Sequence, residues 1–419
     1  MAARITLGTS IAPFHDSSLW SASAGTTATV YAPRTSLSGS AVTSFSHSAY
    51  AYLTYTSATD IDMSAADVLS FEFYCDISGS YLGPVTMRFV FYDVAGNYWQ
   101  LTLPLNALRS GWNSFVVNKP SVVSSYWAKS AGTANWATIR SIVCTATPPT
   151  GQVHRTYYSS IRLGYTSTAY FCLSSDDGYK SDITNVMPIL RDHGLKQTHY
   201  VNAPSTGVLM SRADWDTLYG MGHGISNHGT HTRLTTVTGA AMIAAIEPTM
   251  NSLLGYGYAK SARHFAYPFG EYNAEALAAL VANHYTARMT SSPFCQGHFR
   301  PNGYAEYLLG AYGISSPVPT LAAIQPHLQL AIDTDAYFHL YWHELTSAGD
   351  LANLAAIAEW LADQVAAGTC RVGPVHEYYD WLIGQPTADA VLKDTVFGVD
   401  DQNTGTLVPV KKYLCVTGA

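Results

Sequence analysis

The pattern of hydrophobic and polar positions changes character near residue 165. Before that point, apolar and polar residues alternate in short runs, and no helical periodicity is present. Turn residues such as Ala95-Gly96-Asn97 separate the runs, which lie at residues 68–75, 85–91, 112–117, 138–144 and 159–163. Regular short strands with turn signals between them are typical of two packed antiparallel sheets. The sequence therefore predicts an all-β sandwich, jelly-roll-like, over residues 1–165.

After residue 165, strand-like and helical patterns alternate. Helices are predicted at 181–193, where Gly194 ends the pattern, at 212–220 after the N-cap Ser211, and at 274–282 and 351–366. Short apolar strands are predicted at 197–201, 265–267 and 338–342. This alternation indicates an α/β, barrel-like domain over residues 166–384. Residues 385–419 mix strand and turn residues and are interpreted as a C-terminal extension, either a small β element or an assembly tail.

Two adjacent carboxylates, Asp176 and Asp177, follow an apolar run at residues 169–173 that reads as a buried strand. Placing both near a core is costly unless they turn into a cleft where the strand ends. There, one carboxylate can hold a metal ion while the other acts as a base. An isolated Asp-Asp-Gly is more often a simple turn, so the hypothesis depends on the motifs that follow.

Three histidines, His223, His228 and His231, fall within nine positions. His228 and His231 are three residues apart, so one helical turn or a tight loop can present both on the same side. Two imidazoles and one carboxylate are a usual three-ligand set for a catalytic zinc-like ion, with one position left for water. The alternative is that these histidines are surface loop residues.

Two further segments complete an ordered pattern. Residues 265–273 form a short apolar strand interrupted by Pro268 and Gly270, and residues 338–342 form an aromatic strand followed by His343. The order Asp-Asp-Gly, Asn-His with a nearby His, Pro-aromatic-Gly and strand-terminal His resembles the polysaccharide deacetylase family. Its catalytic part is the NodB homology domain of carbohydrate esterase family 4. The resemblance covers residues 166–384.

This resemblance implies a distorted (β/α) barrel and a role for each matching residue. Asp176 matches the general base and His343 the general acid. The metal ligands correspond to Asp177, His228 and His231, and zinc is the favoured divalent ion. A backbone N–H in the Pro-aromatic-Gly segment helps to hold the oxyanion, which here points to Phe269.

The sequence departs from the family pattern in three places. The two metal-binding histidines are usually four residues apart, whereas His228 and His231 are three apart. The family often has an arginine two residues before the proline to orient the base, and this chain has Ala266. The residue before the Asp pair is usually aromatic, and here it is Ser175.

The composition restricts the classes of partner. The chain has 419 residues, of which 47% are hydrophobic and only 12% charged, and 29 are tyrosines against 14 phenylalanines. Aromatic, weakly charged surfaces suit neutral sugars, although a β-rich protein also uses tyrosine in its strands. A net charge of −7 without a basic run argues against nucleic acid. No apolar run approaches eighteen residues, so we expect no membrane insertion.

The location of action is inferred from two sequence features. The N-terminus lacks the long apolar core of a signal peptide, and the six cysteines read mostly as buried thiols rather than a disulfide framework. The family usually acts outside the cell. A phage tail or virion protein, made in the cytoplasm and acting on the host surface, reconciles these observations. A homo-oligomer, with a trimer as the favoured form, is expected in that case.

Two functional hypotheses follow. The first is a metal-dependent deacetylase that removes N- or O-linked acetyl groups from a bacterial surface polysaccharide. The second is a catalytically inactive carbohydrate-binding tail or adhesion protein on the same fold. The N-terminal sandwich is either a carbohydrate-binding or an assembly domain. Trp99, Trp112, Trp127 and Trp136 are sugar platforms only if they are exposed.

Overall fold

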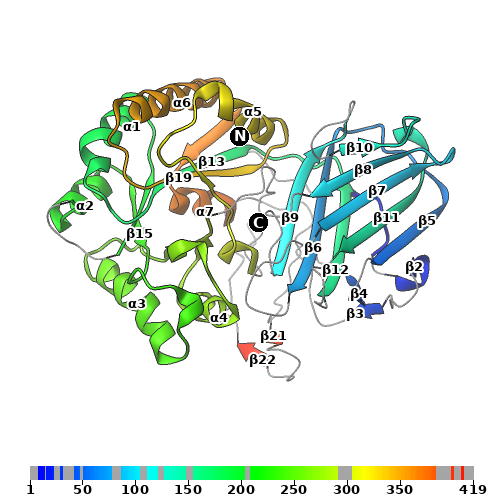
Figure 1. Ribbon diagram of the computed structural model, residues 1–419, viewed down its shortest axis with the longest axis horizontal. Coiled ribbons are helices and arrows are strands. Elements are labelled where there is room, and N and C mark those ends of the chain that lie inside the picture. The colour runs from blue at the N-terminus through cyan, green and yellow to red at the C-terminus, as the bar shows by residue number, and fades with distance from the viewer. Residues whose placement is uncertain are drawn as a thin grey trace, which may run out of the picture.

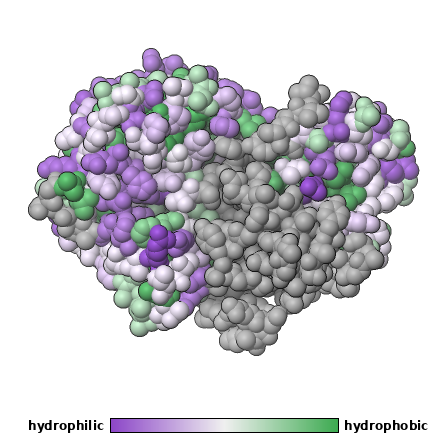
Figure 2. All heavy atoms as spheres, in the orientation of Figure 1, coloured by the Kyte–Doolittle hydropathy of each residue, from purple (hydrophilic) through white to green (hydrophobic). Residues whose placement is uncertain are grey.

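A computed structural model gives the architecture. It describes residues 8–14, 16–22, 29–31, 42–47, 51–77, 86–103, 111–120, 127–147, 154–202, 208–290, 304–383, 398–400 and 407–409. Two parts lie side by side, a barrel surrounded by helices and an antiparallel β-sandwich (Figure 1). Figure 2 shows hydrophilic residues over much of the barrel part of this face, with hydrophobic residues in small separate groups between them.

Two antiparallel sheets form the sandwich. One follows the order β3-β4-β12-β6-β9 with β1 beside β12, and the other follows β10-β8-β7-β11-β5-β2. The strands are β1 (Thr9–Ser10), β2 (Trp20–Ala22), β3 (Thr29–Tyr31), β4 (Val42–His47), β5 (Ala51–Ile61), β6 (Val68–Ile77), β7 (Thr86–Asp93), β8 (Tyr98–Leu103), β9 (Gly111–Asn118), β10 (Trp127–Lys129), β11 (Ile139–Thr147) and β12 (His154–Leu163). Short 3₁₀ helices lie at η1 (Ser17–Leu19) and η3 (Trp136–Thr138).

Alternating positions of these strands fill the space between the two sheets. Phe71 of β6 and Phe89 of β7 are both buried, and their ring centroids lie 4.5 Å apart across the core. Trp99 and Trp127 are buried in the same core, so neither offers a sugar platform. The side chain of Trp112 lies outside what the structure describes.

Parallel strands build the second part. Its eight-stranded sheet follows the order β17-β16-β15-β14-β13-β19-β18, with β20 also paired to β13. The strands are β13 (Ala169–Ser175), β14 (Thr198–Val201), β15 (Gly224–Asn227), β16 (His264–Ala266), β17 (Thr286–Arg288), β18 (Tyr312–Gly313), β19 (Tyr337–Trp342) and β20 (Cys370–Gly373). This distorted (β/α) barrel, preceded by an all-β sandwich, confirms the expected fold class.

Helices cover the outside of the parallel sheet (Figure 1). They are α1 (Met187–Asp192), α2 (Arg212–Gly220), α3 (Ala240–Gly255), α4 (Ala274–Asn283), α5 (Leu321–Asp333), α6 (Ala348–Ala366) and α7 (Val375–Ile383). A π-helix, η4 (Asp182–Val186), leads into α1, and single 3₁₀ turns lie at η5 (Leu234–Thr236), η6 (Pro268–Gly270) and η7 (Tyr304–Tyr307). None of the described helices combines the length and hydrophobicity needed to cross a bilayer.

Local sequence signals explain where several helices begin and end. Ser211 caps α2 through a capping box with Asp214, in which each side chain bonds the other residue's backbone N–H. Gly194 adopts a φ of +68° just after α1, a conformation that glycine reaches without steric cost. Both boundaries agree with the sequence prediction.

The sandwich and the barrel share a packed contact. Val116 of β9 is fully buried and belongs to the hydrophobic core of the barrel part, whereas its neighbours Phe115 and Val117 face the sandwich core. Because side chains alternate between the two faces of a strand, β9 contributes residues to both cores. Strand β9 also lies against η7. The position of the domain boundary at residue 165 stays a prediction.

Three described cysteines, Cys144, Cys172 and Cys370, are free and buried, in line with the interpretation as buried thiols. The described parts of the C-terminal extension are two short strands, β21 (Gly398–Asp400) and β22 (Leu407–Pro409), which pair antiparallel. The choice between a small β element and an assembly tail for residues 385–419 stays a prediction.

Candidate active site

The C-terminal ends of neighbouring parallel strands bring the sequence-predicted residues together. Strands β13 and β19 pair in register as far as Ser175 and Trp342, and the backbone N–H of Asp176 donates to the Trp342 carbonyl at 2.9 Å. Asp176 and His343 therefore leave adjacent strands at the same edge. Likewise, the backbone N–H of His228 donates to the Val201 carbonyl at 2.9 Å, where β14 and β15 end. Catalytic groups of barrel enzymes typically occupy this edge.

Asp177, His228 and His231 converge on one point. Each offers one ligand atom, and the three atoms lie within 4.8 Å of one another. The Asp177 Oδ1 atom is 3.5 Å from His228 Nε2 and 3.2 Å from His231 Nδ1. Tetrahedral ligands at zinc distances of about 2.0–2.2 Å would stand roughly 3.4 Å apart, so these separations fit such an ion. Among the described residues, these three form the one group of at least three His, Cys, Asp or Glu side chains that could hold a metal ion.

Hydrogen bonds fix the first histidine and its loop. His228 is buried, and its Nδ1 atom pairs with the Ala266 carbonyl at 2.9 Å, which leaves Nε2 directed to the cluster. Burial lowers the pKa of His228, although Asp176 and Asp177 oppose the shift, and a neutral imidazole is the form that binds metals. Asn227 accepts from the Gly229 N–H at 2.7 Å and donates to the Ile246 carbonyl at 2.8 Å, which holds the turn.

Left-handed backbone conformations accumulate at this site. Four described non-glycine residues have positive φ, and three of them are Asp177 (+67°), His231 (+59°) and Phe269 (+60°). Such conformations are costly for residues with a Cβ and concentrate where function requires them. At His231, the conformation turns the imidazole toward Asp177 despite the shortened three-residue spacing. The turn thus accommodates the departure from the usual spacing of four.

Asp176 is buried against an arginine that the sequence analysis did not single out. Arg288, the last residue of β17, is fully buried, and its Nη2 atom donates to Asp176 Oδ1. Burial disfavours the ionised form of Asp176, but the Arg288 guanidinium, together with His228 and His343, holds the pKa of Asp176 below its ordinary value. Asp176 is therefore a carboxylate, able to accept a proton. An arginine flanked by the apolar residues Ala287 and Met289 was the available sequence signal.

His343 is partly buried at the end of β19. Its Nδ1 atom lies 3.4 Å from the Ser315 hydroxyl, in the segment after β18, and its ring centroid is 5.9 Å from that of Tyr341. His343 is one of the neighbouring groups that lower the pKa of Asp176. The structure thus gathers Asp176, His343 and the three-residue cluster at one edge of the sheet.

The Pro-aromatic-Gly segment, η6, forms an exposed rim. The Phe269 side chain is 45% exposed, its ring lies 4.9 Å from that of His231, and the Arg233 guanidinium lies 4.1 Å above it. Arg233 also forms an ion pair with Glu271. An aromatic ring at the mouth of the site offers a surface on which a sugar can stack.

A buried polar network lies beneath the Asp pair and was also not predicted. Ser175 donates to Asp182 Oδ2, which is 3.2 Å from His199 Nδ1, and Trp342 Nε1 donates to Asp182 Oδ1 at 3.3 Å. All four side chains are fully buried. Ser175, which stands where the family usually has an aromatic residue, therefore has a polar partner, Asp182, on η4. Because Ser175 directly precedes Asp176, this network anchors the strand end that carries the pair.

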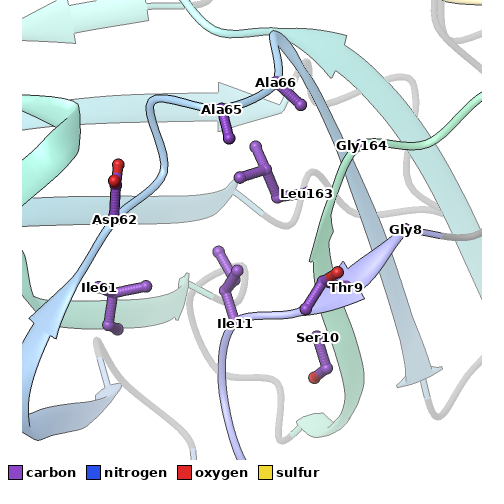
Figure 3. A pocket seen from close by; sticks show the side chains of 10 residues that line it. All are labelled: Gly8, Thr9, Ser10, Ile11, Ile61, Asp62, Ala65, Ala66, Leu163 and Gly164. Atoms are coloured by element: carbon purple, nitrogen blue, oxygen red, sulfur yellow. The ribbon is translucent and has the colours of Figure 1, made fainter.

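A separate cavity of about 700 Å³ lies in the sandwich, between β1, the β5–β6 connection and the end of β12 (Figure 3). Ten residues line it, and they include one carboxylate, Asp62, and no aromatic ring. Asp62 accepts from the backbone and hydroxyl of Ser64 at 2.8 and 2.6 Å. This cavity lacks the stacking surface that sugar recognition uses.

Comparison with known proteins identifies a family for part of the chain. Residues 164–288 match the polysaccharide deacetylase family model. The resemblance to the polysaccharide deacetylase family is thereby confirmed over this range. The matched range contains the Asp pair, the histidine motif, the Pro-aromatic-Gly segment and Arg288; His343 lies beyond it.

Several solved structures share similarity with this chain. A family 4 carbohydrate esterase from Streptomyces lividans in complex with acetate is 19% identical, covers 49% of this chain and 92% of its own, and has a TM-score of 0.34. A peptidoglycan N-acetylglucosamine deacetylase is 15% identical over 50% of this chain and 92% of its own, with a TM-score of 0.35. A mutant of a family 4 pseudoenzyme with restored activity is 13% identical over 51% and 68%, also with a TM-score of 0.35. No curated protein matches the chain.

Proposed function

We propose that this chain is a metal-dependent deacetylase that hydrolyses acetyl groups on a bacterial surface polysaccharide. The observation that carries the proposal is the convergence of Asp177, His228 and His231 beside the buried carboxylate Asp176. A set of ligands alone suits a structural ion. A separate ionised carboxylate, held next to the ligands but outside them, is what hydrolysis requires in addition.

The three-residue cluster would hold the ion, and zinc is the metal we favour. One carboxylate and two imidazoles leave a coordination position open, as catalytic zinc sites do. A divalent ion bound there lowers the pKa of water to about 7 and polarises the acetyl carbonyl. The His231 side chain is half-exposed, so an acetyl group could reach a metal held by this cluster from the solvent.

Two residues of the chain, Asp176 and His343, each carry out one of the two proton transfers. Asp176 accepts a proton from the water whose oxygen attacks the acetyl carbon. The backbone N–H of Phe269 stabilises the negative charge that develops on the carbonyl oxygen. His343 donates a proton to the leaving nitrogen or oxygen as its bond to the acetyl carbon breaks. The products are acetate and a free amine or hydroxyl on the sugar.

The test is acetate release from acetylated glycans. Full-length protein loaded with Zn²⁺ is incubated with N-acetylated and O-acetylated polysaccharides, with and without a chelator, beside Asp176→Asn loaded in the same way. The proposal expects chelator-sensitive release by the wild type and little by the variant. Glycan binding without acetate release from any substrate would instead support an inactive carbohydrate-binding tail or adhesion protein. Comparing the two substrate sets identifies the acetyl linkage.

We further propose that the protein acts outside the cell as part of an assembled particle, as a homo-oligomer such as a phage tail trimer. Two features support this proposal: the surface polysaccharide substrate proposed above, and a charged content of only 12%, which gives little electrostatic resistance to self-association. Light scattering across a wide dilution series measures the mass directly. A constant mass near 45 kDa, the mass of one chain, would contradict an oligomer.

A further inference from the structure

We propose that Arg288 of β17 is the positioning residue for the base Asp176, taking the place of the arginine that this chain lacks at position 266. The inference rests on the proposed function, because it assigns a partner to the base of that reaction. Its observations are independent of the metal cluster. They concern one guanidinium, one carboxylate and the pairing of two neighbouring strands.

Arg288 is held at two points. One terminal nitrogen, Nη2, donates to Asp176 Oδ1, and the other, Nη1, donates to the Met289 carbonyl at 2.9 Å. The rings of Tyr200 and Tyr341 lie 5.0 and 4.5 Å from its Cζ atom. A planar guanidinium fixed by a backbone carbonyl and neighbouring aromatic rings has little rotational freedom. It therefore restricts the orientation of the carboxylate that it contacts.

Strand register explains how the arginine can occupy a different position in the sequence. Strands β16 and β17 run parallel, and Ala266 pairs directly with Arg288. Paired residues of neighbouring strands stand about 4.8 Å apart, with their side chains on the same face of the sheet. Ala266 is fully buried in the same core as Tyr200, against which Arg288 packs. Side chains from both positions thus enter the same space inside the barrel.

A small residue at 266 fits this exchange. The backbone carbonyl of Ala266 accepts a hydrogen bond from His228 Nδ1. Its methyl side chain leaves the interior to the guanidinium arriving from β17. The same strand pair therefore serves both parts of the site: β16 orients a ligand of the metal cluster through its backbone, and β17 orients the base through a side chain.

A competing explanation is that Arg288 only neutralises a buried carboxylate. Removing either partner of a buried ion pair is strongly destabilising, so loss of activity in one variant does not separate the two roles. A variant that restores a guanidinium from the neighbouring strand does separate them. If position matters, Ala266→Arg/Arg288→Ala regains turnover, and if only charge matters, Arg288→Lys is sufficient.

The experiment compares wild type, Arg288→Ala, Arg288→Lys and Ala266→Arg/Arg288→Ala, all full length and Zn²⁺-loaded. Arg191→Ala is the matched control, because the Arg191 side chain is exposed and forms its ion pair with the neighbouring Asp192. For each protein, kcat and KM on a small acetyl ester, bound zinc and thermal midpoint are measured. We expect Arg288→Ala to lose about 10²-fold in kcat, since misplacing a catalytic group costs on this order. KM and zinc content should change little.

The lysine variant should recover only part of kcat, because an ammonium cannot reproduce the fork of a guanidinium. The double variant should exceed Arg288→Ala in kcat. A folded, zinc-loaded Arg288→Ala with wild-type kcat would overturn the inference, as would a folded double variant no better than Arg288→Ala. Should Arg288→Ala not fold, the lysine and double variants decide: full kcat in the lysine variant contradicts positioning. An inactive wild type, by contrast, refutes the proposed function itself.

Discussion

Adding one methyl group at Gly270 should disable the rim of the site. Gly270 has a φ of +69°, and a Cβ there would lie 1.9 Å from Thr290 Oγ1 and 2.9 Å from Thr290 Cβ. Left-handed backbone costs an L-residue roughly 1–2 kcal/mol, and overpacking typically adds about 1–3 kcal/mol. The loop can relieve this clash by moving, which displaces the adjacent backbone N–H of Phe269.

Gly194 provides a matched control. Its φ of +68° is nearly identical, yet a Cβ there would meet no atom within 4 Å. Gly194→Ala therefore carries the backbone cost alone and lies at the end of α1, away from the site. We expect both variants to lower the thermal midpoint, by roughly 2–4 °C per kcal/mol for a domain of this size. Only Gly270→Ala should also lose activity, by about 10²-fold or more, the usual effect of losing an oxyanion donor.

The assay measures kcat for acetate release and the thermal midpoint on the same preparations. Thr290→Ala, introduced into Gly270→Ala, removes the closest contact and should restore part of kcat. Wild-type kcat in Gly270→Ala would refute the assignment of the Phe269 N–H. An equal loss of kcat in Gly194→Ala would show that backbone strain anywhere in the barrel, rather than the local clash, reduces activity.

Four further predictions concern the site and the fold. Asp176→Asn should bind zinc normally but lose about 10²–10⁴ in rate, because an amide cannot accept the proton; a near wild-type rate would identify another base. His231→Ala should weaken zinc binding, measured by competition with a chromogenic chelator; unchanged affinity would remove His231 from the ligand set. Burial lowers the pKa of His223 to about 3 and also depresses the pKa of His264 and His339. Below pH 6.5 the unfolded chain therefore binds more protons than the folded protein, so denaturant titrations should show full stability above pH 6.5 and declining stability below it. Residues 166–419 alone should cleave a small acetyl ester but unfold at a lower temperature, because truncation exposes the surface that Val116 covers; a folded, zinc-loaded but inactive fragment would show that the sandwich helps to build the site.

The sequence was sufficient for elements with a local cause. The Ser211 cap, the Gly194 stop and the alternation of β6 and β7 each lie within a few residues of the element they define. Helices α3 and α5 were not predicted, because each contains a proline, Pro248 or Pro326, that usually ends a helical pattern. Packing of their buried faces compensates for the missing hydrogen bond. Such compensation depends on residues far away in the sequence.

The same distinction holds for the site. The Asp pair, His228, His231 and His343 could be found because each belongs to a short motif, and strand ends bring them together. Arg288 is 112 residues from Asp176 and carries no motif, so only the pairing of β16 with β17 reveals it. The network of Ser175, Asp182 and His199 is similar, since its members meet only once β13, η4 and β14 are packed.

The three left-handed residues at the site have a consequence for engineering this protein. Asp177, His231 and Phe269 each hold a conformation that costs on the order of 1–3 kcal/mol, so the site is less relaxed than the barrel around it. Glycine at any of them would relieve that cost while deleting a side chain of the proposed site. Selection for thermal stability alone would therefore favour variants that lose the proposed site's side chains. A library designed to stabilise this barrel should keep all three unchanged and seek its gains in the helices.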